Sequence, residues 1–352
     1  GGLITTLLEM CFANTEGGME INLDKIKCDD IVKILFAENP GVVIQVADKH
    51  KAEVKKILED AGVGYVKIGV PTEERHILAT LHDATYQFGI DYLRDVWYST
   101  SYLLDRKQSM NGCAKKRFEN YKQQPLEFVF DKSFTGKLSQ FGLDPNRRTP
   151  SGIKAAIIRE KGTNGEREMA YMLYLAGFDV KDVTMTDLIS GRETLEDINM
   201  VVYCGGFSNS DVLGSAKGWA GSFLFNPKAK AALDNFYARE DTLSLGVCNG
   251  CQLMMELGLI TPEDKKKGKM LHNDSHKFES NFLGVTVPMN RSVMFGSLSG
   301  SKLGIWVAHG EGKFSLPYPE DHYNVVLKYS YDEYPGNPNG SDYSVAGIAS
   351  QD

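Results

Sequence analysis

The sequence predicts an α/β protein, with a doubly wound, mostly parallel sheet over residues 151–352 and a smaller α+β segment before it. Two observations lead to this prediction. From residue 151 onward, short apolar runs of strand length alternate with helical patterns, which is typical of a parallel sheet covered by helices. Within residues 141–152, prolines and glycines are grouped as in a linker, so we expect a domain boundary near residue 150.

Residues 1–85 contain two helical patterns and two strand-like runs. The helices are expected at 4–13 and 50–62, and the strands at 41–47 and 65–70. Strand, helix and strand in this order suggest a βαβ-type or split βαβ unit. Residues 86–150 are polar and helical in pattern, so we expect a helical extension and a linker there, without a strand.

The second half of the chain supplies the expected sheet. A helix ends at Gly177, and another begins at Asn226-Pro227, a favoured helix start. A third helix follows residue 248. The expected strands are 153–160, 179–185, 198–204 and 242–248, the first two helices are 164–177 and 226–240, and the later strands lie in 277–289, 302–314, 324–330 and 343–350.

The composition is that of a soluble globular protein. The chain has 352 residues, of which 42% are hydrophobic and 24% charged, and this length allows two domains. No apolar stretch approaches the roughly 18 residues of a membrane span. The net charge of -7 argues against nucleic acid as a partner. The first residues include Glu9 and no basic region, so they are not a signal peptide, and six cysteines then indicate reduced thiols in the cytoplasm.

Two cysteines, Cys248 and Cys251, lie three positions apart where the last predicted parallel strand meets a helix. Three interpretations are open: the two thiols form a redox pair, they supply half of a zinc site, or one is a nucleophile and the other a core residue. A zinc site needs two more ligands, for which Cys204 and either His272 or His276 are the candidates.

The glycines around Cys248 favour the interpretation of this cysteine as a nucleophile. Gly246 and Gly250 stand two residues to each side of Cys248, which is the spacing of a nucleophile elbow. We expect the helix N-terminus to lower the pKa of this thiol, and the N–H of Asn249 to face an oxyanion. Cys251 is expected to be a core residue.

The motif "GVCNGCQLM" resembles the cysteine elbow of class I glutamine amidotransferases, and its "NGCQ" form resembles the glutaminase domain of the phosphoribosylformylglycinamidine synthase family. Segment 204–211, "CGGFSNSD", resembles that family's P-G-G-F-S-x-x-D loop, with Cys204 in place of the proline. The start, "GGLITTLLEMCFA", resembles a segment of its synthetase domain. Further resemblances lie at 159–170, 275–282 and 306–314, in family order.

This resemblance implies a fold, a domain division and a reaction. Residues 151–352 would be a flavodoxin-like class I glutaminase domain truncated at its C-terminus, 86–150 a helical extension and linker, and 1–85 part of an AIR-synthetase-like C-terminal subdomain. Cys248 would attack glutamine, and the released ammonia would convert formylglycinamide ribonucleotide to formylglycinamidine ribonucleotide. The implied oxyanion-hole or substrate-binding residues are Gly205, Gly206, Phe207, Asn249 and Gln252.

The resemblance also implies partners and a missing base. This chain would bind no cofactor itself, whereas ATP and Mg²⁺ would be used by the full-length enzyme, with the remaining synthetase domains as partners. The family's catalytic His and Glu lie in a P-H-x-E-R stretch, which is absent here and is expected past Asp352. The chain alone is therefore expected to be inactive, unless His309 serves as a second base. The alternative is a non-catalytic α/β interaction domain or a C-x-x-C redox domain.

The remaining polar candidates lie in the last third of the chain. His272 and His276 stand in a polar, lysine-rich segment and are expected to be solvated. Glu279 and Glu311 are expected to be surface charges or, less simply, binding residues.

Overall fold

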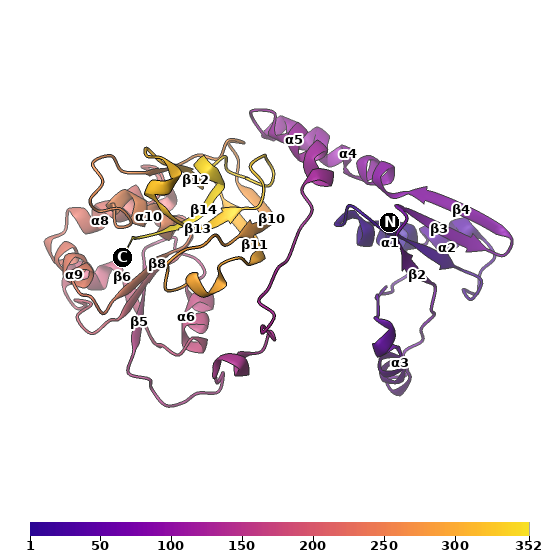
Figure 1. Ribbon diagram of the computed structural model, residues 1–352, viewed down its shortest axis with the longest axis horizontal. Coiled ribbons are helices and arrows are strands. Elements are labelled where there is room, and N and C mark those ends of the chain that lie inside the picture. Colours follow the sequence, from indigo (N-terminus) through magenta and orange to yellow (C-terminus); the bar gives the residue numbers. More distant parts are fainter. Residues whose placement is uncertain (352) are drawn as a thin grey trace. The chain divides into compact units, whose positions relative to one another are not determined.

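A computed structural model describes residues 1–351, and the described chain divides into two compact units. The first unit comprises residues 1–108 and 114–126, and the second comprises 109–113 and the chain from 127 onward. Figure 1 labels their helices and strands. No helix within residues 1–351 is both long enough and apolar enough to cross a membrane.

The first unit is built on a mixed sheet with the strand order β2-β1-β3-β4. Strands β1 and β3 are parallel, and the other neighbours are antiparallel. Apolar side chains of β1 and β3 pack with those of α1 and α2 into one core cluster that includes Leu7, Ile21, Leu35 and Ile77. The elements are α1 (Gly2–Phe12), β1 (Gly18–Asn22), α2 (Ile31–Phe36), α3 (Lys51–Asp60), β2 (Gly69–Thr72), β3 (His76–Leu81), β4 (Ala84–Gly89), α4 (Ile90–Gln108) and α5 (Cys113–Asn120).

The sequence prediction for this unit was partly wrong. Both predicted helices are present as α1 and α3, but residues 41–47, all of them described, form no strand. Val42 is 88% exposed there, so the β-branched run has no sheet or core to pack against. The strand expected at 65–70 begins only at Gly69, and β4 extends to Gly89, inside the segment expected to lack strands.

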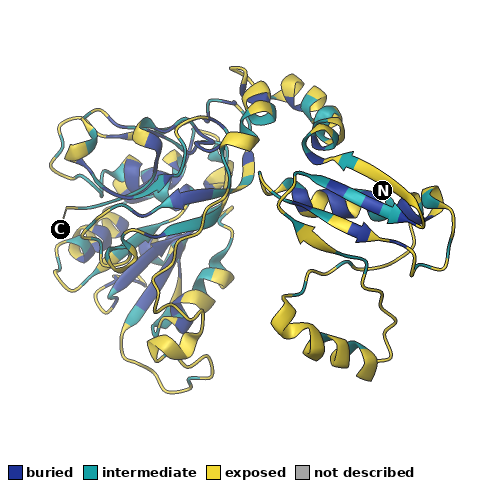
Figure 2. Ribbon diagram, turned by 45° about the vertical axis from the view of Figure 1, so that its right-hand side comes forward, coloured by how far each residue is buried: buried dark blue, intermediate teal, exposed yellow. Residues whose placement is uncertain are grey.

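The second unit contains the predicted parallel sheet, with the strand order β6-β5-β7-β8 and every neighbouring pair parallel. Helix α6 packs on one face, and α7, α8, α9 and α10 pack on the other, which confirms the doubly wound architecture. Strands β5 and β7 are buried almost throughout (Figure 2). The elements are β5 (Lys154–Arg159), α6 (Glu166–Leu175), β6 (Asp179–Thr184), α7 (Met185–Ser190), β7 (Met200–Tyr203), α8 (Lys217–Leu224), α9 (Pro227–Tyr237), β8 (Leu243–Gly246) and α10 (Asn249–Leu257).

An antiparallel sheet with the order β11-β10-β13-β14 follows in the same unit, together with a two-stranded antiparallel sheet of β9 and β12. Helix α10 contacts the core of the parallel sheet through Leu253 and Met254, and an apolar cluster of this later region through Met255. The elbow helix is thus held from both sides. The elements are β9 (Lys269–Leu271), β10 (Glu279–Thr286), β11 (Lys302–His309), β12 (Lys313–Ser315), β13 (Asn324–Tyr329) and β14 (Val345–Ala349).

Short 3₁₀ helices occupy several connections. They are η1 (Asp48–His50), η2 (Tyr121–Gln123), η3 (Leu138–Phe141), η4 (Ser208–Asp211), η5 (Gly296–Leu298), η6 (Glu320–His322) and η7 (Asp342–Ser344). Of these, η4 directly follows the loop after β7 and bears on the candidate site.

Candidate active site

Cys248 lies in a sharp turn between β8 and α10, with a backbone conformation of φ 54° and ψ -112° that few non-glycine residues adopt. The flanking glycines are required by close backbone packing. A Cβ on Gly250 would lie 2.0 Å from the carbonyl oxygen of Tyr203, and one on Gly246 would lie 2.5 Å from that of Gly250. The G-x-C-x-G spacing therefore produces the elbow expected from the sequence.

The loop after β7 lies against this elbow. A Cβ on Gly205 would come 3.1 Å from the Cβ of Cys248. Gly206 has φ +121° and its missing Cβ would lie 2.3 Å from the oxygen of Gly162, so no other residue fits. Backbone hydrogen bonds from Asn164 to Gly205 (2.9 Å) and from Phe207 to Gly162 (2.9 Å) tie the loop to the segment after β5.

Backbone N–H groups of Gly206 and Asn249 both donate to the Cys248 sulfur, and each lowers the pKa of the thiol. Burial is the larger influence, however, and together with the Asp211 carboxylate it raises the pKa of Cys248 overall. The expectation of a lowered pKa was therefore wrong. The thiol itself donates to the carbonyl oxygen of Ala308, at 3.5 Å.

The side chains of Asn249 and Gln252 are engaged inside the protein. Asn249 is 1% exposed, and its amide donates to Gln252 Oε1 at 2.8 Å. Gln252 in turn donates to the carbonyl oxygen of Glu311, at 2.8 Å. These two predicted residues thus join the elbow helix to the turn after β11, and only the main-chain N–H of Asn249 faces the thiol.

Phe207 is the most exposed of the predicted site residues, with 55% of its surface accessible. Its ring lies 6.1 Å from that of Phe278, which is also exposed. Sequence reasoning missed Phe278, although the segment 275–282 had been singled out. The two rings form an apolar pair beside the loop after β7.

His309, the candidate second base, stands at the end of β11, next to Ala308. Its Nδ1 lies 3.2 Å from Oδ1 of the fully buried Asn273, so Nδ1 carries the proton and donates. Asn273 also donates to the main-chain oxygen of His309, at 2.7 Å. Burial lowers the pKa of His309. Among residues 1–351, no hydrogen bond joins a histidine to Cys248.

The other cysteines lie in apolar surroundings. Cys251 packs against the cluster around Met255 and Phe314, and burial raises its pKa to about 12. Cys204 directly follows β7 and is buried in an apolar cluster, and this burial raises its pKa to about 11. Within the described chain, no three His, Cys, Asp or Glu side chains cluster to hold a metal ion. The pKa of about 12 at Cys251 favours a core residue there over the second thiol of a C-x-x-C redox pair.

Two glutamates differ from the expectation of surface charges. Glu279 is 1% exposed and accepts a hydrogen bond from the hydroxyl of Tyr334, at 2.9 Å. Glu311 is partly buried and accepts from the Ser215 backbone N–H, at 3.1 Å. Its other oxygen lies 3.4 Å from Nδ1 of His272, which is largely exposed, as expected. The sequence contained no period or spacing that would have shown these contacts.

Asp211 is a further residue that sequence reasoning did not assign to the site, although it ends the quoted motif "CGGFSNSD". Its carboxylate accepts from the Asn249 amide, at 3.2 and 3.3 Å. The loop after β7 and the elbow therefore share one polar network.

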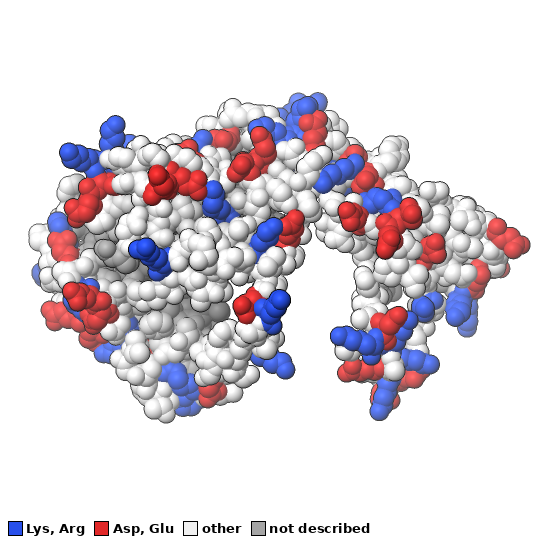
Figure 3. All heavy atoms as spheres, in the orientation of Figure 1, with Lys and Arg blue, Asp and Glu red and all other residues white. Residues whose placement is uncertain are grey.

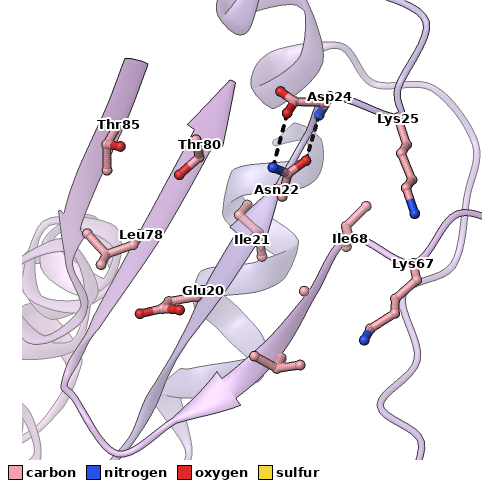
Figure 4. A pocket seen from close by; sticks show the side chains of 12 residues that line it. Glu20, Ile21, Asn22, Asp24, Lys25, Lys67, Ile68, Leu78, Thr80 and Thr85 are labelled. Atoms are coloured by element: carbon pink, nitrogen blue, oxygen red, sulfur yellow. Dashed lines mark hydrogen bonds between the residues drawn. The ribbon is translucent and has the colours of Figure 1, made fainter. Parts of the chain in front are cut away.

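A hollow of about 740 Å³ lies elsewhere, on the sheet of the first unit (Figure 4). Glu20, Asn22 and Thr80 project into it from β1 and β3, with Lys67 at its side. It contains none of the residues predicted for the site. Over the face shown in Figure 3, acidic and basic side chains are interspersed, in keeping with the modest net charge of -7.

Residues 152–352, more than half of the chain, match the model of the CobB/CobQ-like glutamine amidotransferase domain. The chain belongs to this family. Residues 1–82 of this glutamine amidotransferase chain match the C-terminal domain of AIR synthase related proteins. The predicted fold class is therefore confirmed, both for the α/β glutaminase domain and for the α+β segment before it.

Relatives of the glutamine amidotransferase chain match it over its whole length. It is 37% identical to the probable phosphoribosylformylglycinamidine synthase, chloroplastic/mitochondrial, of Arabidopsis thaliana and 36% identical to the phosphoribosylformylglycinamidine synthase of Homo sapiens. The matches cover 26% and 28% of those proteins, so the chain spans little more than a quarter of their length. The structure of PurLQS from Thermotoga maritima matches with 28% identity and a TM-score of 0.45, over 56% of this chain and 82% of that one. The resemblance predicted from the motifs is confirmed.

Proposed function

We propose that this chain is the glutaminase-containing part of a phosphoribosylformylglycinamidine synthase, with Cys248 as the nucleophile. The observation that carries the proposal is the convergence of two main-chain N–H groups, from Gly206 and Asn249, on the thiol of an elbow cysteine. Membership of a glutamine amidotransferase family supports glutamine as the substrate of this site.

The arrangement suits acyl transfer from an amide. The Cys248 thiolate attacks the side-chain carbonyl carbon of glutamine, and the N–H groups of Gly206 and Asn249 stabilise the oxyanion that forms. When the proton lost by the thiol is delivered to the amide nitrogen, the intermediate collapses, expels ammonia and leaves a γ-glutamyl thioester, which water hydrolyses to glutamate and the free thiol. Gly205 lines the hole, and Phe207 contacts the methylene groups of the substrate. Gln252 acts indirectly, by holding Asn249.

In the whole protein, the ammonia would aminate formylglycinamide ribonucleotide in an ATP-dependent step carried out with the remaining synthetase domains. ATP and Mg²⁺ belong to that step. We propose 1–85, 86–150 and 151–352 as the synthetase remnant, the helical extension with linker, and the glutaminase domain. A reduced Cys248 favours a cytosolic location, although the Arabidopsis relative is chloroplastic/mitochondrial by its name.

We also propose that residues 1–352 by themselves hydrolyse glutamine slowly. The Cys248 pKa is raised, and no histidine within the described residues is hydrogen bonded to the thiol to take its proton. General acid–base help is worth roughly 100- to 10,000-fold. His309 is the first alternative base, because it follows Ala308, whose carbonyl contacts the thiol.

The test is ammonia release from glutamine by this chain, beside a version extended with the family's P-H-x-E-R stretch. We expect the extended version to be faster by at least about 100-fold. Equal rates would contradict the missing base, and His309→Gln would then locate it. Selective labelling of Cys248 by a chloroketone analogue of glutamine tests the nucleophile itself, and its absence in both versions would refute the glutaminase function.

A further inference from the structure

The side-chain amide of Asn249 connects the elbow helix to both ends of η4. Its oxygen accepts from the backbone N–H of Ser208, at 3.1 Å, and its nitrogen donates to both carboxylate oxygens of Asp211, at 3.2 and 3.3 Å. Ser208 and Asn249 are each 1% exposed. Buried groups of this kind hold their geometry because every lost partner leaves an unsatisfied polar atom.

The positions of these residues in the chain explain what the network controls. Asn249 supplies one of the two N–H groups on the Cys248 sulfur, and Gly206, two residues before Ser208, supplies the other. The Asn249 side chain therefore spans the two donor-bearing segments, and Asp211 fixes its orientation together with Gln252, whose Oε1 accepts from the same amide nitrogen at 2.8 Å.

Asp211 also closes a strained loop. Asn209, Ser210 and Asp211 have φ angles of 52°, 58° and 48°, three successive left-handed residues without a glycine. The Asp211 carboxylate accepts from the backbone N–H of Ala216, at 3.1 Å, and Ala216 is itself left-handed, at φ 53°. One carboxylate thus joins the end of η4, the start of α8 and the elbow helix.

We infer that Asp211 is a positioning residue that, through the amide of Asn249, sets the distance between the two halves of the oxyanion hole. This inference rests on the proposed glutaminase function. Activation of the nucleophile does not explain Asp211, because its negative charge raises the pKa of Cys248 and so disfavours the thiolate. Positioning of the donors by Asp211 favours reaction with a substrate carbonyl, whereas its charge disfavours the thiolate. Because these two effects have opposite signs, they can be measured separately.

The experiment compares two reagents on the chain in its Asp211→Ala and Asp211→Asn variants. Iodoacetamide requires only a thiolate, whereas a chloroketone analogue of glutamine also places its carbonyl oxygen between the two donors. We expect Asp211→Ala to slow the chloroketone about 10- to 100-fold and to leave iodoacetamide labelling equal or faster. Asp211→Asn keeps one acceptor oxygen, so its chloroketone rate should lie between those of the wild type and Asp211→Ala.

Asp234→Asn is the matched control, because Asp234 is exposed on α9 and pairs with its helix neighbour Lys230. It should leave both rates unchanged. Equal slowing with both reagents, or no slowing with either, would overturn the role of Asp211. If circular dichroism shows that Asp211→Ala does not fold, the iodoacetamide and chloroketone rates of Asp211→Asn test the role of Asp211 instead. A wild-type chain that reacts with iodoacetamide but not with the chloroketone would instead refute the glutaminase function.

A double-mutant cycle tests the route through the amide. If Asp211 acts by holding Asn249, the double variant Asp211→Ala/Asn249→Ala should react with the chloroketone at the rate of Asn249→Ala alone. A further decrease in the double variant would show that Asp211 acts by another path and would overturn the inference.

Discussion

Cys248 and Cys251 lie three residues apart on one helix turn, yet their surroundings differ. Cys248 stands at the mouth of the turn with two N–H groups on its sulfur, whereas Cys251 faces the apolar cluster around Met255 and Phe314. Burial raises both pKa values, and that of Cys251 reaches about 12. Only the thiol of Cys248 has donors that stabilise its anion.

The first prediction is that iodoacetamide labels Cys248 before Cys251. Because the thiolate reacts, labelling of Cys248 should rise by about tenfold per pH unit until the pH passes its raised pKa. Cys251 should stay slow until the pH approaches about 12. Peptide mass spectrometry after brief labelling at pH 7, 8 and 9 measures both. Faster labelling at Cys251 would contradict the assignment of the elbow cysteine.

The second prediction concerns the elbow glycines. Gly250→Ala places a methyl group 2.0 Å from the Tyr203 carbonyl oxygen, so we expect a loss of about 1–3 kcal/mol in unfolding free energy and no chloroketone labelling. Gly221→Ala is the control, since its Cβ would meet Phe225 only at 3.7 Å within α8. That change should stabilise by about 0.5–1 kcal/mol. Urea unfolding measures both, and equal effects would mean that the elbow can relax around a side chain.

At the scale of elements, the sequence predicted the parallel sheet because its strands are short, buried apolar runs and its helices carry recognisable ends. Asn226 caps α9 through Ala229, and Gly177 follows α6 in a left-handed conformation. Such signals are local. Strand β3 was missed because its residues, mostly apolar in sequence, alternate in burial only once the strand is paired. Residues 41–47 have strand composition without a neighbour.

In the candidate site, too, some features could be predicted from local sequence and others could not. Cys248 was identified from the glycine spacing of its turn, whereas Gly205 and Gly206 were implied by the resemblance of "CGGFSNSD" to the family's loop. At all three positions close main-chain packing or a turn limits the residue type, which leaves a mark in the sequence. The net pKa of Cys248 and the partner of Glu279 depend on burial by segments far away in the chain. No pattern within one element carries that information.

The third prediction concerns the segment that joins the linker to the edge strand β6. Asp179 accepts from Arg147 at 2.9 Å and from the backbone of Ser151 and Gly152 at 3.0 and 2.8 Å, and these bonds lower its pKa to about 2. A folded-state pKa below the usual 3.8 contributes stability above pH 4 that is lost as the pH falls towards 2.

Asp179→Asn should therefore lower stability at pH 7 and reduce its loss between pH 4 and 2. It should also increase proteolytic cleavage near residues 147–152, because their tether is removed. Thermal unfolding across this pH range and limited proteolysis measure the two effects. Asp182→Asn is the control. Asp182 is also on β6 and forms an exposed pair with Arg159 of β5, so its substitution should leave cleavage unchanged. Parallel pH profiles in wild type and Asp179→Asn would contradict the prediction.

At the scale of the whole molecule, each compact unit has its own apolar core. Ile77 is fully buried in the first and Trp219 in the second. The fourth prediction is that calorimetry resolves two unfolding transitions. Ile77→Ala should lower only the first unit's transition, by about 2–5 kcal/mol, and Trp219→Ala only the other, by about 3–5 kcal/mol. A single transition that both variants lower would show one cooperative unit instead.

Both donors on the Cys248 sulfur are main-chain atoms. Every amino acid except proline supplies such an N–H, so exchanging a side chain displaces the donor without deleting it. Chemical synthesis can delete it, by replacing the Gly206 or Asn249 amide with an ester that keeps the shape of the backbone. Genetic variation has a different consequence, because a substitution at Gly206 or Gly250 adds a side chain where the backbone leaves no space. Such substitutions would be harmful whatever the polarity of the new residue.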